Sequence, residues 1–317
     1  MANDNARKFL NDTGWANAIR EPLTGDASAR KYFRLRKTDQ TAILMDASQL
    51  PEIVAPFVRI GAHLRQLGFS APAIFARDEA NGLLLLEDFG DTTFAQLLEN
   101  GNEPEELFTF ATDVLIALHK HPREIPKDLR AYSPEKMLLD IELFLDWRTP
   151  GVCEAGRAGF RKAWREVLPV AHRVPVSLLL RDYHAANLMW LSGRDGVRRA
   201  GLLDFQDAYQ GPITYDLVSL LEDARRDVPE DLRKKMIVRY LAQFPSLDRV
   251  AFETSLTILA ALRHTRVLAI FEKLSRERKT DYKQSHSPRV EQLLQKALQH
   301  PILAGVKRWF EEYAKRE

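Results

Sequence analysis

The middle of the chain reads Leu178-Leu179-Leu180-Arg181-Asp182-Tyr183-His184-Ala185-Ala186-Asn187-Leu188-Met189-Trp190-Leu191. Two apolar runs flank a polar turn, a pattern that predicts a strand, a loop and a second strand. The loop carries an aspartate, Asp182, and five residues later an asparagine, Asn187. A further apolar run, residues 200–203, also ends in an acidic residue, Asp204. Polar side chains are therefore delivered twice in succession at the end of a predicted strand.

Asp182, Asn187 and Asp204 have the order and spacing that kinases use for phosphoryl transfer. In protein kinases a loop aspartate accepts the proton of the acceptor hydroxyl, and an asparagine and a second aspartate hold Mg²⁺ at the phosphates of ATP. The alternative is that Asp182 and Asn187 are ordinary turn residues, because both types favour turns. Two such turns in sequence favour the catalytic interpretation. We predict Asp182 as the catalytic residue and Asn187 and Asp204 as metal ligands, with ATP and Mg²⁺ as cofactors.

These segments resemble the aminoglycoside phosphotransferase and choline kinase superfamily. Residues 180–188 carry the likeness together with two later runs, Asp204-Phe205-Gln206-Asp207-Ala208 and Tyr215-Asp216-Leu217-Val218-Ser219-Leu220-Leu221-Glu222-Asp223-Ala224-Arg225-Arg226-Asp227-Val228. Within the superfamily they are most similar to the kinases that phosphorylate the anomeric (C1) hydroxyl of N-acetylmuramate and N-acetylglucosamine in bacterial cell-wall recycling. The resemblance implies an α+β, two-lobed protein-kinase-like fold, with a small antiparallel β-sheet N-lobe and a mainly helical C-lobe.

Strand patterns gather before residue 90, and helical patterns dominate after it. The strand-like runs are residues 31–36, 41–45, 73–77 and 83–87. Helical periodicity then continues to the end of the chain, apart from the strands around the catalytic loop. We predict an N-lobe at residues 1–90 that covers the nucleotide. Residues 91–317 are predicted to form a C-lobe with the catalytic loop, the metal site and the acceptor site.

Nucleotide contacts are predicted from three segments of the N-lobe. The small-residue turn at residues 23–30 can lay backbone N–H groups over phosphates, as in the nucleotide-covering loop of the resembling family, although an ordinary hairpin turn is the alternative. The linker after residues 83–87 meets the adenine edge in a two-lobed kinase. The predicted cofactor-binding residues are Gly25, Asp26, Ser28, Arg34, Glu87 and Phe89.

One strand departs from the kinase pattern. Kinases keep a lysine late in the third strand to hold the α- and β-phosphates, but Met45 stands in that place here. We expect a cation from Arg30, Lys31 or Arg34 to replace it. The alternative for each is an ordinary solvated side chain.

The acceptor is predicted to be a small-molecule sugar. The segment from Asp204 to Asp216 is too short for the activation segment on which protein kinases seat a peptide. The candidate acceptor contacts are charged, polar or aromatic side chains: Arg181, His184, Asp207, Glu142, Trp147 and Arg225. A core aromatic, a loop brace or a solvated cation is the alternative for such residues. Asp216 is predicted to cap the following helix and to pin the catalytic loop.

Composition limits the partners and the compartment. A net charge of +2 over 317 residues gives no case for a nucleic-acid or membrane partner. The single cysteine excludes an intrachain disulfide and indicates a reducing compartment. We therefore expect a cytoplasmic monomer. Two other functions stay open: an aminoglycoside or other alcohol kinase on the same fold, and a catalytically weak nucleotide-binding regulator, which Met45 and the loss of the kinase histidine at Leu180 would suit.

Overall fold

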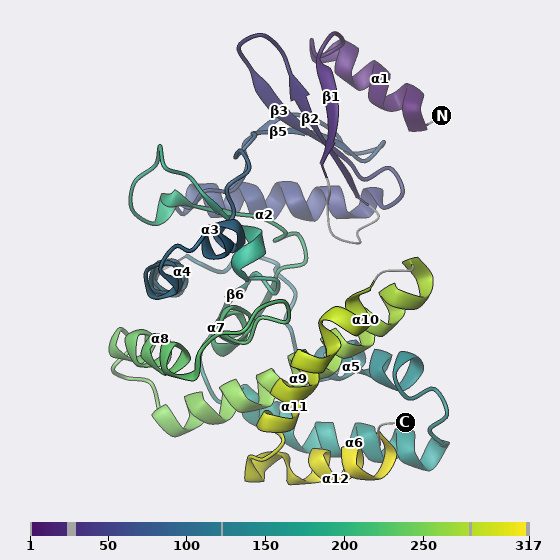
Figure 1. The fold of residues 1–317 in the computed structure, drawn as a ribbon, viewed down its shortest axis with the longest axis vertical. Coiled ribbons are helices and arrows are strands. Elements are labelled where there is room, and N and C mark those ends of the chain that lie inside the picture. Colours follow the sequence, from purple (N-terminus) through teal and green to yellow (C-terminus); the bar gives the residue numbers. More distant parts are fainter. Residues whose placement is uncertain (1, 24–29, 122, 279–280, 315–317) are drawn as a thin grey trace. The chain divides into compact units, whose positions relative to one another are not determined.

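The computed structural model of the protein describes residues 2–23, 30–121, 123–278 and 281–314 (Figure 1). A five-stranded antiparallel sheet and a mostly helical remainder confirm the predicted α+β fold. Across these four ranges no helix has both the length and the apolar character that crossing a membrane requires.

The chain divides into two compact units. The first unit comprises Met1–Glu103 and Ala185–Ala208, and the second comprises Pro104–His184 and Tyr209–Glu317. The division falls inside the predicted catalytic loop. Asp182 therefore belongs to the second unit, whereas Asn187 and Asp204 belong to the first. The predicted lobes, divided at residue 90, stay a prediction.

The first unit is built on a sheet in the order β1-β2-β3-β5-β4. Its strands are β1 (Ile19–Leu23), β2 (Lys31–Arg36), β3 (Thr41–Asp46), β4 (Ile74–Asp78) and β5 (Leu83–Leu86). β3 and β5 are central, and their nearly continuous burial matches their apolar sequences. Proline has no N–H to donate to a neighbouring strand, so it is confined mainly to edge strands. Pro22 lies in β1, which is at an edge of the sheet.

The register of β2 and β3 determines which side chains share a face of the sheet. Tyr32 lies opposite Met45, and Arg34 lies opposite Ile43, so these four point to one face. The alternate residues of β2 point to the other face, where Leu35 is fully buried in a core with α1 (Ala2–Asp12).

The remaining elements of the first unit include a hairpin from the middle of the chain. They are η1 (Pro51–Ile53), α2 (Val54–Gln66), α3 (Phe94–Glu99), η2 (Ala185–Asn187), β7 (Leu188–Trp190), η3 (Gly196–Arg199) and β8 (Ala200–Leu202). β7 and β8 pair antiparallel. The Leu202 N–H donates to the Ser70 carbonyl at 2.7 Å, and the Phe205 ring lies 4.9 Å from that of Phe57 in α2. These contacts attach the hairpin to the N-terminal part of the unit.

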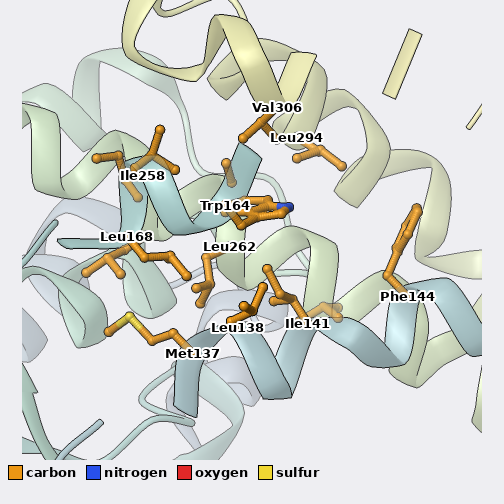
Figure 2. Close-up of a cluster of buried hydrophobic side chains, with 14 of the residues drawn as sticks. Met137, Leu138, Ile141, Phe144, Trp164, Leu168, Ile258, Leu262, Leu294 and Val306 are labelled. Carbon is orange, nitrogen blue, oxygen red and sulfur yellow. The ribbon is translucent and has the colours of Figure 1, made fainter. Parts of the chain in front are cut away.

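The second unit is helical around one short strand pair, in which β6 (Val176–Leu179) lies antiparallel to β9 (Tyr209–Pro212). Its helices are α4 (Pro104–Lys120), α5 (Pro134–Trp147), α6 (Glu154–Ala171), α7 (Thr214–Leu221), α8 (Glu230–Ala242), α9 (Arg249–Arg278), α10 (Tyr282–Ser285), α11 (Ser287–Ala297), η4 (Pro301–Leu303) and α12 (Ala304–Tyr313). Figure 2 shows the core between these helices, where Trp164 of α6 packs among aliphatic side chains such as Ile141 and Leu262. Burial of such side chains contributes about 1.5–3 kcal/mol each.

His119, in the last turn of α4, joins this helix to α8. Its ring is half-buried, with Nδ1 2.7 Å from the hydroxyl of Tyr240 in α8. Burial lowers the pKa of His119 to about 3, so the ring is neutral and joins two helices.

Candidate active site

Asp216 holds the start of the catalytic loop. Its carboxylate is fully buried in α7 and accepts hydrogen bonds from the backbone N–H of Leu180 at 2.6 Å and of Arg181 at 2.8 Å. The predicted pinning of the loop is confirmed. The predicted helix cap is wrong, because Ile213 is the N-cap and has no side-chain hydrogen bond.

The same burial changes the acidity of Asp216. Loss of solvent raises the pKa of Asp216 to about 7, although the two backbone N–H groups act to lower it. The nearby negative charge of Asp182 adds to the rise. The carboxyl group is therefore held in place by two backbone hydrogen bonds although burial disfavours its charged form, which indicates a structural anchor.

We expect Asp216→Ala to lower the melting temperature clearly. The substitution leaves two buried N–H groups without an acceptor, at a cost of about 1–3 kcal/mol each. Melting can be followed by circular dichroism, with Asp227→Ala as the control. Asp227 is exposed and pairs with Arg289, and exposed ion pairs contribute little to stability. Equal melting temperatures for the two variants would contradict the anchoring role.

Asp182 lies half-buried among cations of the second unit. Burial acts to raise the pKa of Asp182, but its electrostatic interactions with Arg266 and, to a smaller extent, with His184, Arg263 and Arg181 outweigh that effect, so its pKa is lowered. The carboxylate is therefore ionised at neutral pH. This is the form that can accept a proton or orient a hydroxyl group.

Arg181, just before Asp182, is held by contacts of its side chain with Asp140, Tyr132 and Tyr209. Its backbone has φ of 69°, in the left-handed region that non-glycine residues rarely adopt. Its guanidinium donates to Asp140 at 2.6 Å and stacks over the rings of Tyr132 and Tyr209, at 4.8 and 5.0 Å. Arg181 is buried, so these contacts fix the backbone that presents Asp182.

Helix α5 brings one carboxylate to the catalytic loop, but not the one predicted. Asp140 contacts Arg181 and Lys136, and Arg266 lies 3.9 Å from it. Glu142 is two residues further, which is about 200° around the helix, and pairs with Arg161 of α6 at 2.8 Å. The structure therefore gathers Asp140, rather than Glu142, with the loop.

The other predicted acceptor residues are placed as follows. His184 is buried, and this burial lowers its pKa, against the opposing charges of Asp223 and Asp182. Arg225 lies 6.0 Å from the ring of Tyr282, at the α10 end of the unit. Trp147, at the end of α5, lies 5.6 Å from the ammonium of Lys273. Asp207 is exposed in the first unit. Their roles toward an acceptor stay predictions.

In the first unit Asp204 is the second residue with left-handed backbone at the predicted site, with φ of 58°. Its carboxylate accepts hydrogen bonds from Arg30 at 2.5 Å and from the Gln206 amide at 2.8 Å. The Leu203 N–H donates to the Asn187 carbonyl at 3.0 Å, so the two predicted metal ligands lie on adjoining backbone. Asp204 is partly exposed, and carboxylate and amide oxygens are the hard donors that Mg²⁺ prefers.

Asn187 and Asp204 together offer two side chains with oxygen donors, which is the number expected where a metal is also bound by the phosphates of a ligand. No cluster of three or more histidine, cysteine, aspartate or glutamate side chains is arranged to hold a metal within the ranges that the structure describes. Mg²⁺ is usually bound by one or two carboxylates together with phosphate oxygens and water. Asn187 and Asp204 fit that mode of binding.

Glu87 and Phe89, two of the predicted nucleotide-binding residues, lie in the linker that follows β5. Glu87 pairs with Arg194, which also lies 5.1 Å from the ring of Phe89. A Cβ atom at Gly201 would stand 2.7 Å from that ring, so glycine is needed for the ring to pack on β8. Arg194 had no predicted role, because nothing in the local sequence marks it. Gly25, Asp26 and Ser28 lie outside the described residues.

Arg34 binds residues of the same linker. Arg34 is 5% exposed, and its guanidinium contacts Asp88 at 2.8 Å, Asp91 at 2.6 Å and the Gly90 carbonyl at 2.9 Å. These three bonds fix the chain directly after β5. A contact between Arg34 and a nucleotide stays a prediction.

Known proteins resemble this chain along most of its length. The sequence pattern of the phosphotransferase enzyme family matches residues 20–252. A protein named N-acetylmuramate/N-acetylglucosamine kinase from Caulobacter vibrioides is 34% identical, over 96% of this chain and 94% of its own. A protein of the same name from Pseudomonas aeruginosa is 34% identical over 80% of this chain and 76% of its own.

The fold of this chain is also similar to that of a solved structure. The ADP-bound aminoglycoside phosphotransferase APH(2'')-Ib matches with a TM-score of 0.61 and 16% identity, over 94% of this chain and 97% of its own. The sequence match covers well over half of the chain, and the related kinases extend over nearly all of it. The chain belongs to the phosphotransferase enzyme family.

Proposed function

We propose that the protein is a sugar kinase that transfers the γ-phosphoryl group of ATP to N-acetylmuramate or N-acetylglucosamine in peptidoglycan recycling. The observation that carries the proposal is the 34% identity to a kinase of that name over almost the full length of both chains. The ionised, cation-surrounded Asp182 supports it, because phosphoryl transfer to a hydroxyl needs such a carboxylate. The lone cysteine suits a reducing compartment such as the cytoplasm.

Asp182 is the group that would act on the acceptor. Its carboxylate would accept a hydrogen bond from the sugar hydroxyl and orient the oxygen toward the γ-phosphorus. It would take the proton as the new P–O bond forms and the bond between the γ-phosphorus and the leaving ADP breaks. The hydrogen bonds from Leu180 and Arg181 to Asp216 keep the backbone before Asp182 fixed during this step. A fixed carboxylate loses little entropy when the acceptor arrives.

Asn187 and Asp204 would hold Mg²⁺ together with the phosphates. The ion, when bound, supplies positive charge that offsets the charge developing on the transferred group. The proposal takes the joint action of these residues and Asp182 from their kinase-like spacing in the sequence. The adjoining backbone of Asn187 and Leu203 supports the pairing of the two ligands.

We further propose that the phosphoryl group is transferred to the anomeric (C1) hydroxyl of the sugar. The motive is the likeness of residues 180–188 and 204–228 to anomeric sugar kinases. The expected product is a 1-phosphate, which has no free reducing end and shows phosphorus coupling to C1 in its ¹³C spectrum. The measurement is NMR of the product made from N-acetylglucosamine, with the 6-phosphate as the reference compound. A product that still reduces copper reagents would exclude C1 as the site.

Turnover and binding assays with MgATP and a panel of sugars and aminoglycosides separate the other possible functions. Turnover of an aminoglycoside but neither sugar would retain the family and refute the sugar as acceptor. Nucleotide binding without turnover of any acceptor would indicate a regulator.

A further inference from the structure

This chain lacks the phosphate-binding lysine that kinases keep late in the third strand of the sheet. Met45 of β3 is fully buried in the place of the usual lysine, opposite Tyr32 on one side and Leu84 on the other. The triphosphate of ATP nevertheless needs positive charge from the protein, because its charge is only partly offset by Mg²⁺. Three nearby side chains could supply it: Arg30, Lys31 and Arg34.

The structure separates these three candidates. Lys31 is exposed, and strand alternation points it to the opposite face of the sheet from Tyr32 and Met45. Arg34 shares the face of Met45, but its guanidinium is buried among Asp88, Asp91 and the Gly90 carbonyl. Moving Arg34 to a phosphate would leave two carboxylates of the linker without their cation.

Arg30 differs from both. It directly precedes β2, and its guanidinium lies 6.0 Å from the ring of Tyr32, whose side chain shares a face with Met45. The guanidinium is 2.5 Å from Asp204, the carboxylate expected at the metal. Arg30 and Asp204 both belong to the first unit. Arg30 therefore reaches the phosphate end of the predicted nucleotide site from the strand next to Met45.

We propose that Arg30 takes over the role of the missing third-strand lysine and binds the polyphosphate of the nucleotide, and that Asp204 holds its charge when no nucleotide is bound. The inference rests on the proposed function for the nucleotide, but not for the sugar. A phosphate group offers a guanidinium the same paired, charge-assisted hydrogen bonds as a carboxylate does. Arg30 can thus exchange one anionic partner for another without being left unpaired at any stage.

The exchange has a physical rationale at Asp204. A carboxylate already neutralised by an arginine is a poor ligand for a cation alone, since the two positive charges compete for the same oxygens. Polyphosphate relieves the competition because it gives Arg30 a new partner. We therefore expect Mg²⁺ alone to bind weakly and nucleotide to promote its binding.

The test compares Arg30→Met with Lys31→Met. Both remove one positive charge from adjacent residues, but only Arg30 lies at Asp204. Affinities for ATP, ADP and adenosine are measured by calorimetry in the presence of Mg²⁺. Arg30→Met should weaken ATP and ADP about 10–100-fold, the value of one or two charge-assisted hydrogen bonds, and leave adenosine within about twofold. Lys31→Met should bind all three as the wild type does, and Arg30→Lys should retain most of the ATP affinity.

Each result decides something. If Arg30→Met binds ATP as tightly as the wild type, Arg30 is only the counter-ion of Asp204 and the proposal is overturned. An equal loss for adenosine and ATP would also overturn it, because the effect would then not depend on phosphate. If the wild type binds no nucleotide, the proposed function fails together with this inference. If ATP binds but no sugar reacts, the proposal for Arg30 is unaffected.

Discussion

Asp182→Asn should lower the rate of phosphoryl transfer by about 10²–10⁴-fold, the range commonly contributed by a positioned base. Asparagine has nearly the same shape, so the loop stays anchored through Leu180 and Arg181. The substitution removes the negative charge of the Asp182 carboxylate, which the surrounding cations keep ionised in the wild type. Proton transfer and orientation of the acceptor hydroxyl are lost together.

The effect should be confined to chemistry. Coupled turnover gives kcat, and calorimetry gives the affinity for MgATP, which should stay within about twofold of the wild type because the substitution changes a group predicted to serve the acceptor. Asp231→Asn is a matched control, since this aspartate is exposed on α8. Retention of most of the wild-type kcat in Asp182→Asn would rule out its assignment as the base.

Asp204→Ala is expected to abolish the Mg²⁺ dependence of nucleotide binding. A carboxylate that coordinates Mg²⁺ beside phosphates cannot be replaced by a methyl group, and the remaining ligand, Asn187, is neutral. The substitution also leaves Arg30 without the partner that it has at 2.5 Å. Two opposite effects follow: metal-dependent affinity should fall, whereas metal-free affinity for ATP should rise because Arg30 is no longer held.

Titration of ATP with and without Mg²⁺ separates these effects. In the wild type the metal should strengthen binding, and in Asp204→Ala the two titrations should coincide. Asp195→Ala is a suitable control, because Asp195 is an exposed residue of the same hairpin. If Mg²⁺ strengthens ATP binding to Asp204→Ala as it does in the wild type, another residue must hold the metal.

Sequence alone predicted those elements whose stability comes from local apolar patterns. The runs at β3, β5 and β6 are strongly apolar and were predicted as strands. β9 was not, because Tyr209–Pro212 contains a glycine and a proline and is a strand only through its pairing with β6. β1 was missed for a similar reason, since Pro22 disfavours a strand except at an edge. α10 is short and polar, so its own sequence carries no apolar stripe that marks a helix.

Some residues of the candidate site could likewise be predicted from the sequence, and others could not. Asp182, Asn187 and Asp204 could be found because their spacing is local and tied to one chemistry. Asp140, Arg263 and Arg266 could not, since each is a charged residue on a helix and resembles a solvated one until the helices pack. Helix α9 shows why: its 30 residues are enclosed by several neighbours, so no single apolar stripe marks which charges point inward. For Arg30 the sequence left three candidates open, and only strand register and side-chain contacts distinguish them.

The division of the chain between His184 and Ala185 has an evolutionary consequence. The residue proposed to act on the sugar is anchored by the helical unit, and the residues proposed to hold metal and phosphate are anchored by the sheet unit. Each half of the reaction thus depends on a separate core. Mutations that reshape the helical unit can accumulate and change which alcohol is accepted, while selection preserves the handling of ATP. Such independence would let one ancestral framework diversify toward many acceptors.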